Sequence, residues 1–265
     1  MNKVFAFYTA LLNAWPMVID FGLPQIVKSG KKVAPTRRMQ LSAFPVLGAV
    51  CGLFLVLLGA FAIHVFNPVA GSLLFAVLAV LFLEFKDSGR GLGLFLSLVL
   101  ALFSGMPWRD TLPRLKSDLN RPLNTPLAVV FLSLLEISKL LLFFTLALYS
   151  TKYWLAVVFC GSFALQASLM LLPQAGTQIP FLAVSPDNRH FLWFGVAPFA
   201  LAALFYFPFA ALAAAAFFFV FLRFAERTLK EEFDGVTADM ITLAGTLTEY
   251  ALLLIGIFLA LHRLG

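Results

Sequence analysis

The feature that most constrains this chain is a succession of long apolar runs, most of them long enough to cross a bilayer. A hydrocarbon core of about 30 Å needs about 20 residues of helix, and only helices or closed barrels satisfy their backbone polar groups there. Hydrophobic residues make up 62% of the 265 residues and charged residues 12%, about half the share in a soluble domain. The sequence therefore predicts an all-α, polytopic membrane protein with a single integral membrane domain over residues 1–265.

The apolar runs and the breaks between them predict about seven spans. Pro68 and Gly71 mark a short turn between the first two, and Pro208 divides 191–224, which is too long for one span. The predicted spans are 44–66, 70–85, 126–149, 153–172, 192–206, 208–222 and 241–261.

The N-terminal segment 4–27 is apolar but contains Pro16, Asp20 and Pro24, which weaken a spanning helix. We expect an interfacial helix here, and a first true span is the alternative. A removable signal peptide is not expected, because the segment lacks a small-x-small cleavage site.

Basic residues gather in polar segments that the predicted spans place on one side. Segment 28–38 contains Lys and Arg but no acid, which assigns it to the cytoplasm by the positive-inside rule. The run 92–105 is short for a span and has basic flanks, so we expect a re-entrant segment that returns to the cytoplasmic side. The predicted cytoplasmic loops are 28–43, 84–91, 106–125, 173–190 and 223–239.

The net charge of +6 follows from these loops, which would face anionic lipid, so it requires no nucleic acid. We expect a multi-pass protein of a bacterial or archaeal cytoplasmic (inner) membrane, and a homo-oligomer is compatible with the sequence. Polarity concentrated at one membrane face favours an interfacial enzyme or a docking protein over a pore-like transporter. Cys51 and Cys160 lie in apolar runs and are expected to be core residues.

The stretch 226–249 combines acids, bases, a glycine and hydroxyls at the start of the last span. Asp239 and Glu249 are about 2.8 helical turns, or roughly 15 Å, apart. Glu249 lies inside the apolar run, where an ionisable group is costly and is a functional candidate. The alternative is a solvated loop followed by one polar contact between helices. Another span carries Glu136 and Lys139 three residues apart, which predicts a buried ion pair.

Three segments resemble motifs of a known family. They are 44–52 (Phe-Pro-Val-Leu-Gly-Ala-Val-Cys-Gly), 116–126 (Lys-Ser-Asp-Leu-Asn-Arg-Pro-Leu-Asn-Thr-Pro) and 234–249 (Asp-Gly-Val-Thr-Ala-Asp-Met-Ile-Thr-Leu-Ala-Gly-Thr-Leu-Thr-Glu). They are similar to Phe-Pro-x-x-Gly-x-x-x-Gly, Lys-Asp-Ser-Arg-x-Gly-x-x-Gly and Gly-Gly-x-Thr-Gly-Asp-x-x-Gly-Ala-x-x-Glu-x-x-Glu of the cobalamin synthase family (adenosylcobinamide-GDP ribazoletransferase). The positions that match are Asp118 and Arg121 in the second motif and Gly235, Thr237, Asp239 and Glu249 in the third.

Other positions depart from the family. Its acidic motif Asp-Gly-x-Ala-Asp-Thr-x-Asp-Gly corresponds here to Glu84-Phe-Lys-Asp87-Ser-Gly. Ala238 replaces a glycine, Thr246 replaces a glutamate, and Gln166 stands where the family has an arginine. The alternative is therefore a diverged, catalytically inactive or re-purposed member that acts as a membrane binding or docking protein.

The resemblance implies a Mg²⁺-dependent transferase that joins adenosylcobinamide-GDP to α-ribazole or its phosphate and releases GMP, in the last steps of cobalamin (vitamin B12) biosynthesis. Carboxylates suit Mg²⁺ and arginines suit phosphate. The implied metal ligands are Asp87, Asp118 and Asp239. The implied catalytic residues are Asp118, Arg121, Asp239 and Glu249, and the implied substrate-binding residues are Arg114, Lys116, Thr237 and Gly235.

Overall fold

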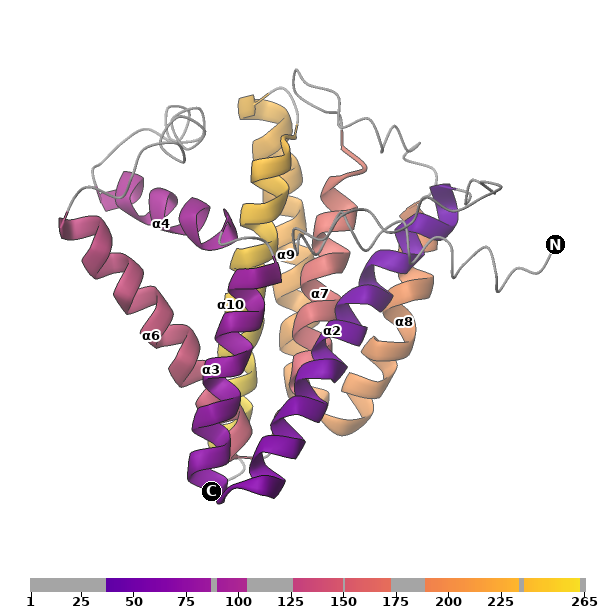
Figure 1. Ribbon diagram of the computed structural model, residues 1–265. Helices are drawn as coiled ribbons and strands as arrows, with labels where there is room; N and C mark the ends of the chain where they lie inside the picture. The colour runs from indigo at the N-terminus through magenta and orange to yellow at the C-terminus, as the bar shows by residue number, and fades with distance from the viewer. Residues whose placement is uncertain are drawn as a thin grey trace, which may run out of the picture.

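The computed structural model describes residues 37–86, 90–103, 126–149, 151–172, 189–233 and 236–262. This part of the chain forms a bundle of helices without strands (Figure 1). The helices are α2 (Arg37–Val65), α3 (Pro68–Lys86), α4 (Arg90–Phe103), α6 (Pro126–Leu148), α7 (Trp154–Leu169), α8 (Arg189–Tyr206), α9 (Pro208–Phe233) and α10 (Ala238–His262).

Five helices are long and apolar enough to cross a membrane, which confirms the predicted all-α membrane class. The five stretches are Ser42–Val65, Pro68–Lys86, Val129–Leu148, Pro208–Thr228 and Asp239–Phe258. Two further apolar helices, Trp154–Leu169 and Trp193–Tyr206, are shorter. The count of about seven spans includes these two and stays a prediction.

Several helices extend beyond the predicted spans into segments that the sequence assigned to loops. The helix α2 already begins at Arg37, and α9 continues to Phe233, so 37–43 and 223–233 are helical. Apolar patterning marks the part of a helix that lies in lipid, but a polar extension still satisfies its backbone hydrogen bonds. The break at Pro208 is confirmed, because α8 ends at Tyr206 and α9 begins at Pro208. Segment 4–27 lies outside the described residues.

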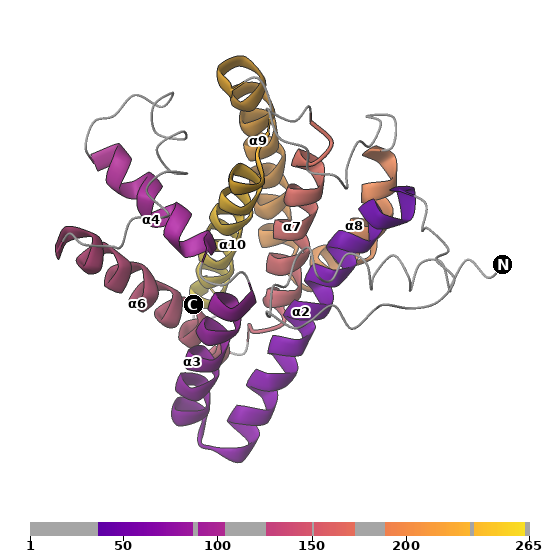
Figure 2. The same cartoon turned by 45° about the horizontal axis from the view of Figure 1, so that its top comes forward.

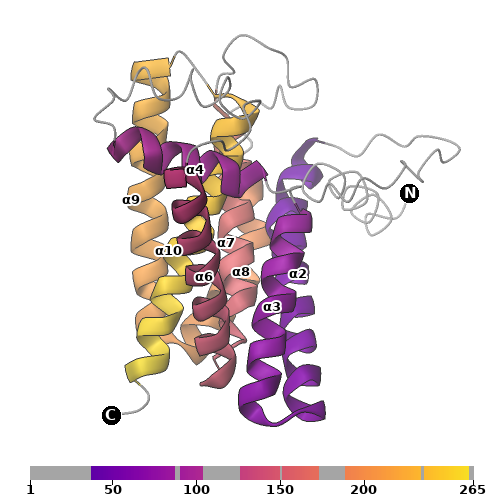
Figure 3. The same ribbon diagram turned by 60° about the vertical axis from the view of Figure 1, so that its left-hand side comes forward.

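The short helix α4 lies across the bundle instead of along it (Figures 1 and 3). Its Phe95 ring packs against Tyr250 of α10, with ring centroids 5.0 Å apart. Its last residue, Phe103, packs against Phe131 of α6 at 5.1 Å, and Figure 2 shows the two helices together at one edge. The expected re-entrant path stays a prediction, because 104–125 lies outside the described residues.

The helices α2 and α7 pack closely through two glycines on one face of α2. A Cβ added at Gly48 would lie 2.3 Å from the Phe159 carbonyl oxygen, and one at Gly52 would lie 2.4 Å from that of Leu155. Small residues four apart let two backbones approach, and such close packing favours helix association in lipid. The glycines of the 44–52 motif therefore act here as a packing surface.

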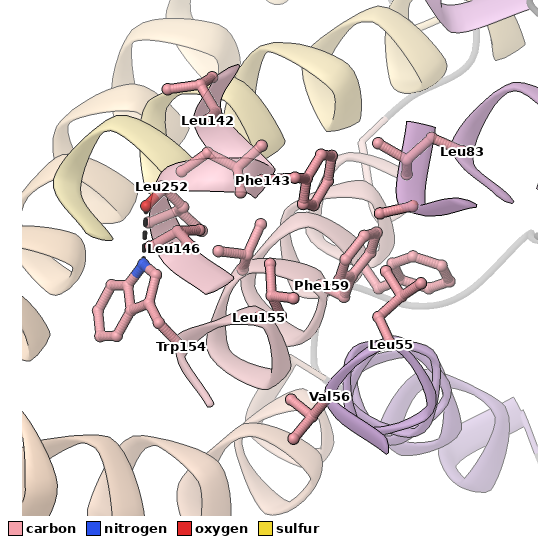
Figure 4. Close-up of a cluster of buried hydrophobic side chains, with 14 of the residues drawn as sticks. Leu55, Val56, Leu83, Leu142, Phe143, Leu146, Trp154, Leu155, Phe159 and Leu252 are labelled. Atoms are coloured by element: carbon pink, nitrogen blue, oxygen red, sulfur yellow. Dashed lines mark hydrogen bonds between the residues drawn. The ribbon is translucent and has the colours of Figure 1, made fainter. Parts of the chain in front are cut away.

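The main apolar core lies where α2, α3, α6, α7 and α10 meet (Figure 4). Trp154 is fully buried there, and its indole Nε1 donates a hydrogen bond of 2.7 Å to the Leu252 carbonyl of α10. The Phe75 and Phe143 rings meet edge to face at 6.2 Å. Large apolar side chains also cover the outside of the bundle, and Phe205 and Phe209 are each 83% exposed. Such a surface is compatible with lipid and not with water.

Candidate functional site

A buried ion pair joins the end of α3 to the middle of α10. Lys86 Nζ lies 2.6 Å from Glu249 Oε1, and the two side chains are 6% and 8% exposed. Ser162 Oγ of α7 lies 3.1 Å from the same carboxylate oxygen and 3.0 Å from the Gly245 carbonyl. The Lys86 ammonium also lies over the Phe159 and Phe163 rings, 5.6 and 5.3 Å from their centroids. Each charge therefore has a partner in a region where an unpaired charge would be costly.

A second group of charges lies beside this pair and joins α3 to α6. Buried Lys139 donates to Glu84 of α3 and lies 3.2 Å from Glu136 on its own helix. The predicted pairing of Glu136 with Lys139 is thus confirmed, and Glu84 is the closer partner. Tyr250 of α10 faces the same group, with its ring centroid 5.9 Å from Lys139 Nζ and its hydroxyl donating to the Leu135 carbonyl at 3.1 Å.

We call these five residues the charged cluster: Glu84, Lys86, Glu136, Lys139 and Glu249. The three carboxylates and two ammonium groups sum to a formal charge of −1. A cavity of about 10 Å³, about the size of one water, lies among Glu84, Lys139, Thr246, Glu249 and Tyr250. In the part of the chain that the structure describes, the charged cluster joins helices around a space too small for a substrate.

The N-terminus of α10 presents a different polar arrangement. Thr237 Oγ1 accepts a hydrogen bond from the Met240 backbone N–H at 3.4 Å, so Thr237 caps the helix. Asp239 lies in the first turn of α10 and is half-buried. The partial positive charge of a helix N-terminus favours a carboxylate or a phosphate at this position. Thr237 and Asp239, two residues that the sequence analysis assigned to a site, thus lie together at the start of this helix.

The predicted site residues fall in different places. Asp239 and Glu249 lie on one continuous helix, about 2.8 turns or roughly 15 Å apart along its axis, as their spacing predicts. The structure brings Glu249 together with Lys86 and Ser162, which is a pairing that the sequence analysis missed. The other predicted site residues lie outside the described residues: Asp87, Arg114, Lys116, Asp118, Arg121 and Gly235.

The partner of Glu249 had one signal in the sequence. A carboxylate inside an apolar span requires a counter-charge, and Lys86 is one of the bases at the end of another apolar run. Gln166 of α7 also lies against this part of α10. A Cβ at Gly245 would come within 1.9 Å of Gln166 Nε2, so the glycine makes room for that side chain.

The family resemblance implies a Mg²⁺ site with carboxylate ligands. Within the described ranges no group of three or more His, Cys, Asp or Glu residues could hold a metal ion. The carboxylates of the charged cluster already face lysines, so they do not fit a metal site. Asp239 could supply one hard oxygen ligand, while the other predicted ligands, Asp87 and Asp118, lie outside the described residues.

Fold and site together define the class: an all-helical membrane protein with paired charges buried between its helices. Comparison with protein-family models, with curated proteins and with solved structures found no match. The class therefore rests on the chain itself, and a particular activity is a matter for proposal.

Proposed function

We propose that the protein is a membrane-embedded, Mg²⁺-dependent transferase of substituted phosphate groups, similar to cobalamin synthase. It would transfer the cobinamide phosphate of adenosylcobinamide-GDP to a hydroxyl of α-ribazole or its phosphate. The new phosphate ester bond would form at that hydroxyl, the diphosphate bond would break, and GMP would leave. Bound Mg²⁺ would neutralise charge on the diphosphate and on the leaving GMP.

The observation that carries the proposal is the start of α10. The segment that resembles the family's last motif includes Thr237 as the helix cap and Asp239 in the first turn. A carboxylate at this helix end suits a metal ligand, and the adjacent backbone N–H groups suit a phosphate. Asp239 would bind Mg²⁺ directly or through water, and the remaining ligands would be Asp87 and Asp118.

The charged cluster supports the proposal indirectly, because it fixes the helix that carries Asp239. Lys86 holds α10 against the end of α3, and Ser162 holds it against α7. Arg114, Lys116 and Arg121 would bind substrate phosphates, since Arg side chains form two parallel hydrogen bonds to them. Glu249 would act on the acceptor hydroxyl only if its pairing with Lys86 opened during turnover.

The direct test is to incubate purified protein in lipid vesicles with adenosylcobinamide-GDP, α-ribazole and Mg²⁺. The proposal expects one GMP released for each cobamide formed, and no release when the metal is chelated. A protein that releases no GMP with Mg²⁺ or any other divalent metal would overturn the enzyme proposal.

Asp239→Asn tests the role of the helix start. The change keeps the shape and removes the charge, so a metal ligand predicts a loss of about 10² or more in turnover. Unfolding stability should change little, because asparagine keeps the shape of the side chain and Thr237 still caps the helix. Glu136→Gln is the matched control. It also neutralises a carboxylate, but Lys139 keeps Glu84 as a partner, so turnover should be retained. Equal turnover of wild type and Asp239→Asn would contradict the assignment.

A second candidate is a membrane binding protein without catalysis. The closed charged cluster favours it, since its cavity of about 10 Å³ leaves Glu249 no contact with an acceptor. This candidate expects saturable binding of adenosylcobinamide-GDP to vesicles that contain the protein, with no GMP release. Binding followed by release would favour the enzyme instead.

A further inference from the structure

A large cavity lies on the other side of α7 from the charged cluster, and none of the site residues predicted above lines it. Its volume is about 660 Å³, within the range of small-molecule sites, and its walls come from α7, α8 and α9 with Leu252 of α10. Small side chains leave the space open: Gly161 and Ala164 on α7, Ala200 and Ala203 on α8, and Ala215 on α9. We call this space the apolar cavity.

The polar groups that line the apolar cavity lie at one end. They are Ser168, near the end of α7, and Arg223 and Glu226, in the second half of α9. The other end is formed by apolar residues from the start of α7 and α9, such as Val157 and Ala211. The lining therefore changes from apolar to charged along the axis of the bundle, as a membrane lipid does.

The length of the apolar cavity also fits one leaflet. Ala211 and Arg223 are twelve residues apart on α9, about 18 Å along the helix axis. Half of a hydrocarbon core is about 15 Å thick. A single acyl chain that entered beside Arg223 would end near Ala211.

The charged end is arranged to receive an anion. The Arg223 side chain is 67% exposed, and its guanidinium carbon lies 5.4 Å from the Phe219 ring centroid. Glu226 is a loose partner at 3.9 Å, which leaves guanidinium donors available to a phosphate. Trp193 and Phe218 bring α8 and α9 together near this end, with ring centroids 6.3 Å apart. An arginine beside aromatic rings at the end of a span is typical of the headgroup region.

We infer that the apolar cavity binds one anionic phospholipid, with an acyl chain among α7, α8 and α9 and the phosphate at Arg223. The outer faces of α8 and α9 carry the highly exposed Phe205 and Phe209, so the cavity lies beside lipid and not beside water. At one end the exposed Arg223 guanidinium suits the phosphate of an anionic headgroup, and the apolar length suits an acyl chain. The inference does not depend on the proposed transferase activity.

The test uses the full chain in vesicles of phosphatidylcholine with a minority of phosphatidylglycerol. After extraction into mild detergent, native mass spectrometry counts the lipids retained. We expect one phosphatidylglycerol for each protein, although phosphatidylcholine is in excess. Retention of phosphatidylcholine in proportion to its abundance would overturn the inference.

Two neighbouring alanines on α9 give a matched pair. Ala215 lines the apolar cavity and Ala216 does not, and both are exposed. Ala215→Phe should fill the space and lower phosphatidylglycerol occupancy about tenfold, while Ala216→Phe should leave it unchanged. Equal occupancy in the two variants would overturn the site. If Ala215→Phe fails to fold, Ala200→Phe on α8 makes the same test from the opposite wall.

The headgroup is tested separately with Arg223→Gln, against Arg227→Gln as the control. Both remove one positive charge from an exposed position on α9, but only Arg223 lines the apolar cavity. Arg223→Gln should abolish the preference for phosphatidylglycerol over phosphatidylcholine, and Arg227→Gln should keep it. Equal preference in both variants would show that net charge, and not this site, selects the lipid.

Discussion

The two sides of α7 differ in where charged groups lie and in how much open space remains. Toward α3, α6 and α10, the bundle buries the charged cluster around a cavity of about 10 Å³. Toward α8 and α9, it leaves about 660 Å³ open and keeps charge at one end only. One helix thus contributes Ser162 to the closed side and Gly161 and Ala164 to the open side.

The difference shows how similar apolar helices can serve two purposes. Buried ion pairs require fixed geometry, because each charge depends on its partner for solvation. Small apolar side chains do not need a partner in a fixed position. The space that they leave open suits a flexible ligand. We therefore expect substitutions on the closed side to change stability, and substitutions on the open side to change binding.

The largest expected effect comes from Lys86→Met, which leaves Glu249 buried without its ammonium partner. Loss of one member of a buried pair typically costs about 3–5 kcal/mol of unfolding free energy. Unfolding in detergent micelles free of anionic lipid would measure it. Adding Glu249→Gln should recover much of the loss, because no unpaired charge then remains.

The open side supplies the control. Arg223→Gln removes a charge from a loose pair whose arginine is 67% exposed, and such pairs contribute about 0–1 kcal/mol. Similar losses for Lys86→Met and Arg223→Gln would show that the two sides do not differ in this way.

The next largest change in stability is expected from substitutions of two glycines. At Gly245 an added Cβ would lie 1.9 Å from Gln166 Nε2 and 2.7 Å from its Cδ, so the whole side chain must move. Gly245→Ala should cost about 1–3 kcal/mol, as overpacking does.

Among the described residues, the added Cβ of Gly161→Ala meets Leu252 Cδ1 alone, at 2.7 Å, and the Leu252 side chain lines the apolar cavity, into which it can turn. The better helix propensity of alanine should make this variant neutral or more stable. Thermal unfolding of both variants under the same conditions tests the contrast. A Gly161→Ala variant less stable than Gly245→Ala would contradict it.

The smallest effect is expected for two buried serines on α7. Ser162→Ala removes the hydroxyl next to the Glu249 carboxylate and should cost about 1 kcal/mol. Ser168→Ala removes a hydroxyl that bonds to Ala164 of its own helix and should change stability by less than about 0.5 kcal/mol. The measurement is the unfolding free energy of the two variants under the same conditions. A larger loss for Ser168→Ala than for Ser162→Ala would show that the hydroxyl on the cavity side makes the more important contact.

Much of the helical arrangement was predictable because its signals are local. Apolar length predicts the spanning helices, and Pro208 predicts the break between α8 and α9. The polar extension of α9 to Phe233 was missed, because hydropathy reports the lipid boundary and not the end of the helix. Glu136 and Lys139 were paired correctly since they are one turn apart.

The partners across helices were not predictable in this way. Lys86 and Glu249 are 163 positions apart, and no local pattern relates them. The apolar cavity was not predictable from the sequence either. The alanines of α9 are visible in the sequence, but open space depends on which small residues of α7 and α8 face them.

The glycine contact between α2 and α7 has a consequence for the order of events during synthesis. About 100 residues separate Gly52 from Leu155, whose carbonyl it meets. Protein synthesis adds about 5–20 residues per second, so roughly 5–20 s pass between the synthesis of α2 and that of its partner α7. During that delay its bare backbone face is open to any other helix with a small-residue surface, including a second nascent copy. A chaperone or insertase that shields this face until α7 arrives would raise the yield of correctly assembled protein.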